Sequence, residues 1–127
     1  MKTQEELFEI AIKAREEQIK TMLSDTFDVI QKKIEEEANE GEFDYVHHCG
    51  NIRSSYQDEL LSECIEMIKP FEQHGFKVCI TDEGNDYLSD IYIYLTWNNE
   101  DPRIHFSNFI DYQMIYPQKT LREERFE

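Results

Sequence analysis

Residues 76–97, FKVCITDEGNDYLSDIYIYLTW, consist of two β-rich runs separated by a polar turn, and this stretch decides the fold. Both runs alternate with a period of two, which is typical of β-strands. The apolar positions on one face are Phe76, Val78 and Ile80 in the first run and Ile91, Ile93, Leu95 and Trp97 in the second. Asp82-Glu83-Gly84-Asn85-Asp86 has the composition of a turn, so the stretch predicts a β-hairpin. Tyr92 and Tyr94 make the second strand apolar on its other face too, and we expect the N-terminal helices or the C-terminal tail to cover that face.

A further strand and a helix precede the hairpin. From Glu42 onward the period is again two, and one strand face collects Phe43, Tyr45, His47 and Cys49. Ser55 and Asp58 then indicate the start of a helix, which Pro70 is expected to kink or end. The apolar side of that helix consists of Leu60, Leu61, Cys64, Ile65 and Ile68. The order strand, helix, strand predicts that the first two strands are parallel through a right-handed crossover, in a small mixed sheet of three to four strands.

The first forty residues are predicted to form a helical arm. Thr3 and Glu6 have the spacing of a capping box. Apolar residues then recur at helical spacing, at Phe8, Ile12, Ile19, Leu23, Phe27, Ile30, Ile34 and Ala38. An unbroken helix of this length would extend about 55 Å, although a globule of this chain length has a radius of gyration of about 14 Å. We therefore predict two helices, about 4–23 and 25–39, with a break near Asp25; the alternative is one long helix that projects toward another subunit.

The C-terminal third carries weaker signals. A fourth strand is predicted from three apolar residues, Ile104, Phe106 and Phe109. The segment Tyr112–Pro117 is apolar but irregular and should pack against the body, while Thr120 with Glu123 indicates a short last helix. Since no repeat or linker is evident, the sequence predicts one α+β domain, composed of a helical arm (1–40), an α/β body (41–110) and a tail (111–127).

The charge of the chain is concentrated in its centre. The net charge is −15, and residues 35–102 carry seventeen Asp and Glu against only Arg53, Lys69 and Lys77. Nucleic acids and anionic membrane surfaces would be repelled by this stretch, whereas a basic protein would be attracted. The sequence shows neither a secretion signal nor an apolar run long enough to span a bilayer, and we expect the three cysteines to be free thiols in the cytoplasm.

Three alternatives with catalytic or metal chemistry have less support. His47 and Cys49 share a strand face and are of ligand type for zinc, but no second close pair joins them. The turn carboxylates from Asp82 to Asp90 could attract Mg²⁺, yet acids around Gly and Asn are also what an exposed turn requires. A Cys–His nucleophile pair has no local support, and Cys64 and Cys79 have the pattern of core residues. We therefore predict no cofactor, no metal site and no enzymatic activity.

The stretch Ala38–Phe43 leading into a strand, then a helix, then Gly75–Val78, then a tyrosine-rich strand ending in Trp97, resembles many small, mostly uncharacterised proteins encoded by bacteriophages. The resemblance covers residues 30–97, lies at the level of the fold and transfers no functional residue. It implies either a virion or accessory component, or a small acidic inhibitor of host nucleases, CRISPR effectors or transcription proteins acting in the host cytoplasm.

Two functions follow as hypotheses. The first is an acidic protein that docks on a basic, nucleic-acid-binding protein by imitating phosphate charge. The predicted partner-binding residues are Glu59, Glu63, Glu66, Asp82, Glu83, Asp86, Asp90, Glu100 and Asp101. The second is a structural or assembly protein that oligomerises, for example as a homodimer, through its helical arm. The predicted seam consists of Phe8, Ile12, Ile19 and Leu23.

Overall fold

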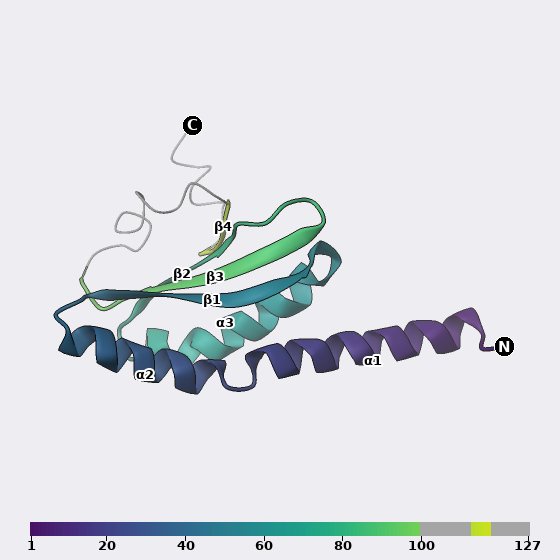
Figure 1. Cartoon of the computed structure of the whole chain (residues 1–127), viewed down its shortest axis with the longest axis horizontal. Coiled ribbons are helices and arrows are strands. Elements are labelled where there is room, and N and C mark those ends of the chain that lie inside the picture. Colours follow the sequence, from purple (N-terminus) through teal and green to yellow (C-terminus); the bar gives the residue numbers. More distant parts are fainter. Residues whose placement is uncertain (100–112, 118–127) are drawn as a thin grey trace.

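The computed structural model of the chain describes residues 1–99 and 113–117 and shows an α+β fold, as the sequence predicts (Figure 1). In chain order the elements are α1 (Gln4–Leu23), α2 (Thr26–Asn39), β1 (Asp44–Arg53), the 3-10 turn η1 (Ser54–Tyr56), α3 (Gln57–Gln73), β2 (Lys77–Asp82), β3 (Leu88–Thr96) and β4 (Gln113–Tyr116). The three helices lie together on one side of a four-stranded sheet.

The helical arm is broken where the sequence predicts. The capping box at its start is formed, because the Thr3 hydroxyl accepts a bond from the Glu6 N–H (3.2 Å) and the Glu6 carboxylate accepts one from the Thr3 N–H. Ser24 and Asp25 form the turn between α1 and α2. Gly41 follows α2 with a φ of 88°, a left-handed conformation that glycine adopts without strain.

The sheet is antiparallel rather than mixed. Its order is β1-β3-β2-β4, and each neighbouring pair in this part of the chain runs antiparallel. β1 and β2 run in the same direction on either side of α3 in the chain, as the sequence predicts, but β3 lies between them. No neighbouring pair in the described sheet is therefore parallel, and the expectation of a mixed sheet is wrong. The hairpin of β2 and β3 is confirmed, with Val78 opposite Leu95. β3, the strand that is apolar on both faces, lies inside the sheet and is hydrogen-bonded to β1 along one edge and to β2 along the other.

The segment that was expected to be irregular contains strand β4. It pairs with β2, with Thr81 opposite Met114 and Ile80 opposite Tyr116, and the register shifts between these two positions. The two edges of the described sheet are therefore β1 and β4. The fourth strand expected at Ile104, Phe106 and Phe109, and the helix expected at Thr120 and Glu123, lie outside the described residues.

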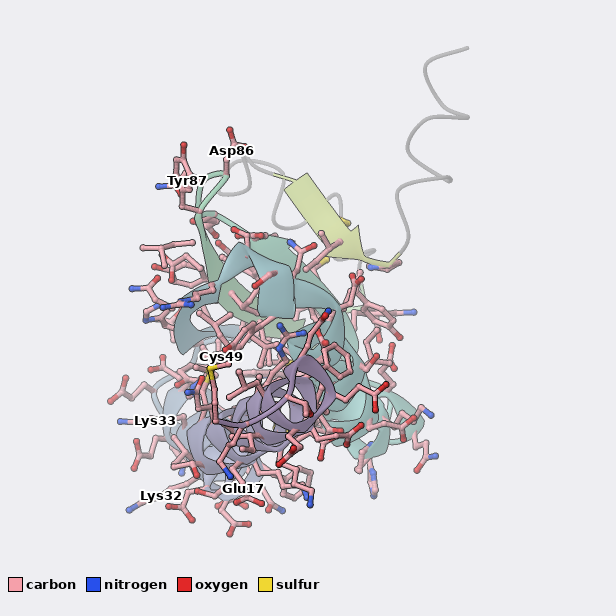
Figure 2. All side chains as sticks on the ribbon, turned by 90° about the vertical axis from the view of Figure 1, so that its right-hand side faces the viewer. Glu17, Lys32, Lys33, Cys49, Asp86 and Tyr87 are labelled. Carbon is pink, nitrogen blue, oxygen red and sulfur yellow. The ribbon has the colours of Figure 1, made fainter. Side chains whose placement is uncertain are left out.

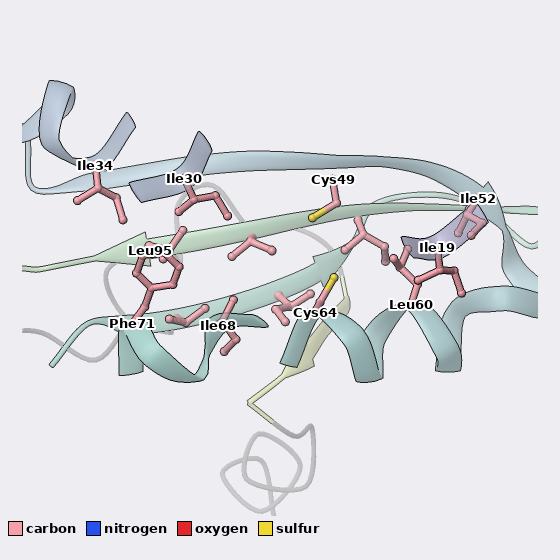
Figure 3. Close-up of a cluster of buried hydrophobic side chains, with 14 residues drawn as sticks. Ile19, Ile30, Ile34, Cys49, Ile52, Leu60, Cys64, Ile68, Phe71 and Leu95 are labelled. Carbon is pink, nitrogen blue, oxygen red and sulfur yellow. The ribbon is translucent and has the colours of Figure 1, made fainter. Parts of the chain in front are cut away.

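The main core lies between the sheet and the helices (Figure 3). α1 and α2 contribute Ile19, Ile30 and Ile34, so the N-terminal helices cover the same face as α3. Of the two segments expected on the second face, only the C-terminal tail contributes there among the described residues, through Met114. That second face carries a smaller cluster of Cys79, Tyr94 and Met114, with Tyr92 beside it. α3 continues through Pro70 to Gln73, so the proline does not end the helix where it occurs.

Candidate interaction surfaces

The hairpin carboxylate Asp82 is occupied by the fold of its own turn. One of its oxygens accepts the backbone N–H groups of Gly84 (2.9 Å) and Asp90 (3.0 Å), and the other accepts the side-chain amide of Gln57 at the start of α3. Partial burial works against the charged form, but these hydrogen bonds prevail and lower the pKa of Asp82. Asp82 therefore closes the hairpin and ties it to α3.

Glu83 and Asp90 are also engaged, on the second face of the sheet. Glu83 accepts hydrogen bonds from the hydroxyls of Tyr94 (2.6 Å) and Thr81 (2.9 Å), and burial together with Glu83 raises the pKa of Tyr94. The Asp90 carboxylate contacts the imidazole of His48, which stacks on Tyr92. Of the predicted hairpin acids, Asp86 alone is exposed; it lies at the hairpin tip beside Tyr87, on the sheet side of the molecule (Figure 2).

The predicted acidic stripe on α3 is partly neutralised by bases. Glu59 forms an ion pair with Arg15 of α1 (2.8 Å), and the Arg15 guanidinium lies 4.2 Å from the centre of the Tyr56 ring. The hydrogen bond from Arg15 lowers the pKa of Glu59. Glu66 pairs with Lys69 (2.7 Å), and Glu63 is exposed.

The structure thus does not bring the predicted acids together into one surface. Asp82 faces α3, Glu83 and Asp90 belong to the second face of the sheet, and the α3 stripe lies on the helical side. Glu100 and Asp101 lie outside the described residues. Most of the acids that the structure describes in this set have a structural contact within the chain.

A denser acidic cluster was missed by the sequence reasoning. It surrounds the end of α2 and is called here the acidic corner, with the residues Glu35, Glu36, Glu37, Glu40 and Glu42. No Lys or Arg occurs between Lys33 and Arg53 in the sequence, and the last turn of α2 contains no base. Since a helix C-terminus carries partial negative charge, carboxylates there oppose the helix dipole. A run of acids at a predicted helix end is the signal that could have found this cluster.

The acidic corner is open to solvent. All of its residues are exposed except Glu37, which is half-buried, and Glu36 forms an exposed ion pair with Lys33 (3.3 Å). A basic residue, Lys77, lies at the same end of the sheet as the first residue of β1, because Thr96 of β3 has Lys77 as its partner on one side and Asp44 on the other. The exposed ion pair of Glu36 with Lys33 is of a kind that contributes little to stability.

The predicted seam of the helical arm is divided by the structure. Ile19 is 2% exposed in the main core and Leu23 packs against it, so both serve the fold of the chain itself. Phe8 is 62% exposed and Ile12 is half-buried. The N-terminal half of α1 extends past the end of the sheet (Figure 1).

The histidine and cysteine candidates have other roles. His47 shares a hydrogen bond with the Tyr45 hydroxyl (3.0 Å), and burial, then His48, lowers the pKa of its imidazole. Cys49 and Cys64 face each other in the core (Figure 3), and the Cys64 thiol together with burial raises the pKa of Cys49, which disfavours a reactive thiolate. Within residues 1–99 and 113–117, no three His, Cys, Asp or Glu side chains are arranged to hold a metal ion.

A groove of about 920 Å³ lies between α1 and β1. α1 contributes Glu17, Gln18, Thr21 and Met22 to its walls, and β1 contributes residues 49–53, with Tyr56 and Leu88 beyond them. Gly50 has a φ of 129°, and a side chain there would point toward Met22. The groove therefore lies beside the C-terminal part of α1.

A scan against protein-family models, a search of the curated proteins and a search of the solved structures found no match to this chain. The helices that the structure describes include none that is both long and apolar enough to cross a membrane.

Proposed function

We propose that this protein is a non-enzymatic binding protein that docks on a basic, nucleic-acid-binding protein through the acidic corner and inhibits or modulates it. The observation that carries the proposal is the placement of five exposed or half-exposed carboxylates at the end of a helix whose dipole they oppose. Such an arrangement weakens the helix, and a cationic partner would supply the compensating interaction.

Electrostatics gives the proposed mechanism. The net charge of −15 attracts a basic partner over a long range and accelerates its approach. In contact, carboxylates of the acidic corner take the places of backbone phosphates, since an arginine fork binds either group through paired hydrogen bonds. The partner's nucleic-acid groove is then occupied, which is the basis of inhibition.

The resemblance to small phage proteins suggests which partners to test first. Host nucleases, CRISPR effectors and transcription proteins all have grooves lined with arginine and lysine, and all would be met in the host cytoplasm. Glu63 and Asp86, which remain exposed from the predicted set, lie outside the acidic corner and provide acids for comparison.

An affinity capture experiment with two matched variants tests the proposal. The immobilised protein is exposed to a bacterial lysate at low and at high salt, and captured proteins are challenged with duplex DNA. The test variant carries Glu35→Gln, Glu40→Gln and Glu42→Gln, and the control carries Asp58→Asn, Glu63→Gln and Asp86→Asn. Both variants lose three charges, and the control neutralises exposed acids that lie outside the acidic corner.

We expect the immobilised chain to capture a basic nucleic-acid-binding protein that duplex DNA displaces. High salt should weaken the capture steeply. The corner variant should lose the capture, while the control variant should retain it. Capture that resists salt and DNA, equal capture by both variants, or the absence of any captured protein would count against the proposal.

Assembly through the helical arm is the second candidate function. It is favoured by the exposed apolar side chains of α1, because Leu7, Phe8 and Ile10 are 54%, 62% and 49% exposed. Light scattering over a range of protein concentrations tests it, and a monomer throughout would remove it.

A further inference from the structure

We propose that a small pocket between α2 and α3, beside the acidic corner, receives one arginine side chain of the basic partner protein. It is called here the aromatic pocket, and its rings come from Phe27, Phe71 and Phe76. The inference rests on the docking function proposed above and names the chemical group of the partner that this chain would recognise.

The aromatic pocket lies between α2 and the C-terminal end of α3. α2 contributes Phe27, Ile34 and Glu35 to its walls, and α3 contributes Phe71. Both helices run toward the same end of the molecule (Figure 1), and Ile34 and Phe71 lie at one end of the main core (Figure 3). Glu35 belongs to the acidic corner as well, so the pocket and the corner share a residue.

The rings of the pocket belong to a continuous aromatic cluster. The ring centre of Phe71 lies 4.9 Å from that of Phe27 and 5.7 Å from that of Phe76. Trp97 extends the cluster, with its ring centre 6.1 Å from that of Phe76. The Trp97 indole N–H donates to the backbone carbonyl of Glu42 (3.1 Å). The cluster thus leads from the pocket to a second residue of the acidic corner.

The size of the pocket favours a single side chain as its occupant. Its volume is about 220 Å³. Pockets for drug-sized ligands have volumes of roughly 300–1,000 Å³, so this one is too small for such a ligand. Phe71 is 5% exposed, whereas Phe27 and Phe76 are half-buried and retain some exposed surface. A long, flexible side chain of a partner can therefore reach the rings from outside.

The polar groups that line the pocket offer hydrogen-bond acceptors. Glu35 is exposed, and its ionised carboxylate only accepts hydrogen bonds. His74 Nδ1 donates to the carbonyl of Pro70 (2.7 Å), since a carbonyl can only accept, and the neutral ring therefore keeps Nε2 as an acceptor. Gln31 can add its amide oxygen. Among the described residues, no Lys or Arg lines the pocket. A cation with several N–H donors complements this lining.

Arginine matches both the rings and the acceptors. Its planar guanidinium stacks on aromatic faces and carries five N–H donors that can bind a carboxylate such as Glu35 through paired hydrogen bonds. The ammonium group of lysine is more strongly hydrated, so its transfer against aromatic rings costs more. The apolar stem of arginine can pack against Ile34 while the charged head remains near Glu35. An apolar side chain would leave the acceptors of the pocket without partners.

An NMR titration with short peptides tests the occupant. The ¹⁵N-labelled chain is titrated with blocked tripeptides that carry arginine, citrulline, lysine or norleucine between two glycines. Citrulline has the shape of arginine without its charge, and norleucine supplies an apolar stem alone. The arginine peptide should shift the amide signals of Gln31, Glu35 and His74 saturably and leave that of Asp86 unchanged. The citrulline peptide should bind at least about fivefold more weakly, and the lysine and norleucine peptides should also bind more weakly.

Two pairs of variants locate the binding site. Glu35→Gln should weaken binding of the arginine peptide about three- to fivefold, whereas Glu40→Gln removes the same charge from the acidic corner outside the pocket and should have little effect. Phe27→Leu removes one ring and no charge, and should weaken binding at least about threefold. Phe43→Leu is its control, because Phe43 is 58% exposed and does not line the pocket. Circular dichroism checks the folding of Phe27→Leu, and the exposed Glu35→Gln decides the test if Phe27→Leu unfolds.

Capture from the lysate separates this inference from the proposed function. Phe27→Leu leaves the net charge of the chain unchanged and should weaken capture of the basic protein, whereas Phe43→Leu should not. Capture that the corner variant loses but Phe27→Leu retains, without binding of the arginine peptide, would remove the inference and leave the proposed function. Binding of the arginine peptide in the pocket, without any captured protein, would support the inference and count against the proposed function.

Three results of the titration would overturn the inference. Norleucine that binds as tightly as arginine would show that the pocket takes an apolar side chain. Lysine that binds more tightly than arginine would show that the guanidinium is not the group recognised. Shifts spread over the whole acidic surface, with equal losses in Glu35→Gln and Glu40→Gln, would show attraction by net charge without a pocket.

Discussion

The β2–β3 hairpin and the acidic corner are both rich in carboxylates, yet they use them in opposite ways. In the hairpin, Asp82 accepts two backbone N–H groups and Glu83 accepts two hydroxyls, so the charges hold the turn together. In the acidic corner the carboxylates lie at a helix end where the backbone carbonyls already carry negative charge. The count of acids is similar in the two regions, but only the hairpin gains stability from them. Asp82 and Glu83 therefore serve the fold, whereas the carboxylates of the acidic corner, apart from the Glu36–Lys33 ion pair, are available for the proposed contact with a partner.

The largest effect is expected when the key hairpin carboxylate is removed. Asp82→Ala deletes the acceptor for Gly84, Asp90 and Gln57, and should lower the free energy of unfolding by about 2–3 kcal/mol. Urea denaturation measures the change. Asp86→Ala in the same turn is the matched control and should change stability by less than about 0.5 kcal/mol, because Asp86 is exposed. Equal effects of the two variants would show that Asp82 contributes no more to the stability of the fold than the exposed Asp86 does.

The stabilisation by Asp82 should depend on pH in a defined direction. Because its folded-state pKa is lowered, the contribution is fully present above the unfolded-state pKa of about 3.9 and is lost as the pH falls from there through the folded-state value. The stability difference between the original chain and Asp82→Ala should therefore shrink between pH 5 and about pH 3. A difference that stays constant over this range would mean that the charge of Asp82 is not what holds the turn.

A smaller effect is expected for the hydroxyl that binds Glu83. Tyr94→Phe keeps the ring but removes the donor at 2.6 Å, and should cost about 1 kcal/mol in thermal or urea unfolding. Tyr87→Phe is the control, since Tyr87 is 82% exposed at the hairpin tip. If both tyrosine variants were equally stable, the hydrogen bond from Tyr94 to Glu83 would not contribute to the stability of the fold.

The smallest effect, with the opposite sign, is expected in the acidic corner. Glu35→Gln, Glu40→Gln and Glu42→Gln together should raise the free energy of unfolding by up to about 0.5 kcal/mol, because they relieve repulsion at the end of α2. Asp28→Asn in the first turn of the same helix should lower it by a similar amount, since an acid is favourable there. A destabilised corner variant would show that these carboxylates have a structural task after all.

The elements that were predicted well depend on local signals. The capping box at Thr3, the break at Asp25 and the hairpin around Gly84 are each specified by residues within a few positions of one another. The burial of Cys64 and Cys79 also follows from the periodicity of their own elements. Local patterns therefore specified α1, α2, the hairpin and part of the core.

The features that were missed depend on contacts distant in sequence. β3 lies between β1 and β2, and β4 pairs with β2. This order depends on which strand edges are still unpaired when each strand is added. The period of two in a strand's sequence shows which side chains share a face, but it does not show which strands are neighbours. The pair of Arg15 with Glu59 joins residues 44 positions apart. The role of Asp82 was the avoidable omission, because an aspartate two residues before a glycine is a common local turn signal.

The irregularity at Gly50 has a consequence for aggregation. β1 is an edge of the described sheet, and its pairing with β3 slips between His48 and Gly50, where Cys49 is the extra residue. Such a bulge interrupts the even row of N–H and C=O groups that an incoming strand would need as a template. Growth of a continuous intermolecular sheet, and with it fibril formation, is disfavoured along β1.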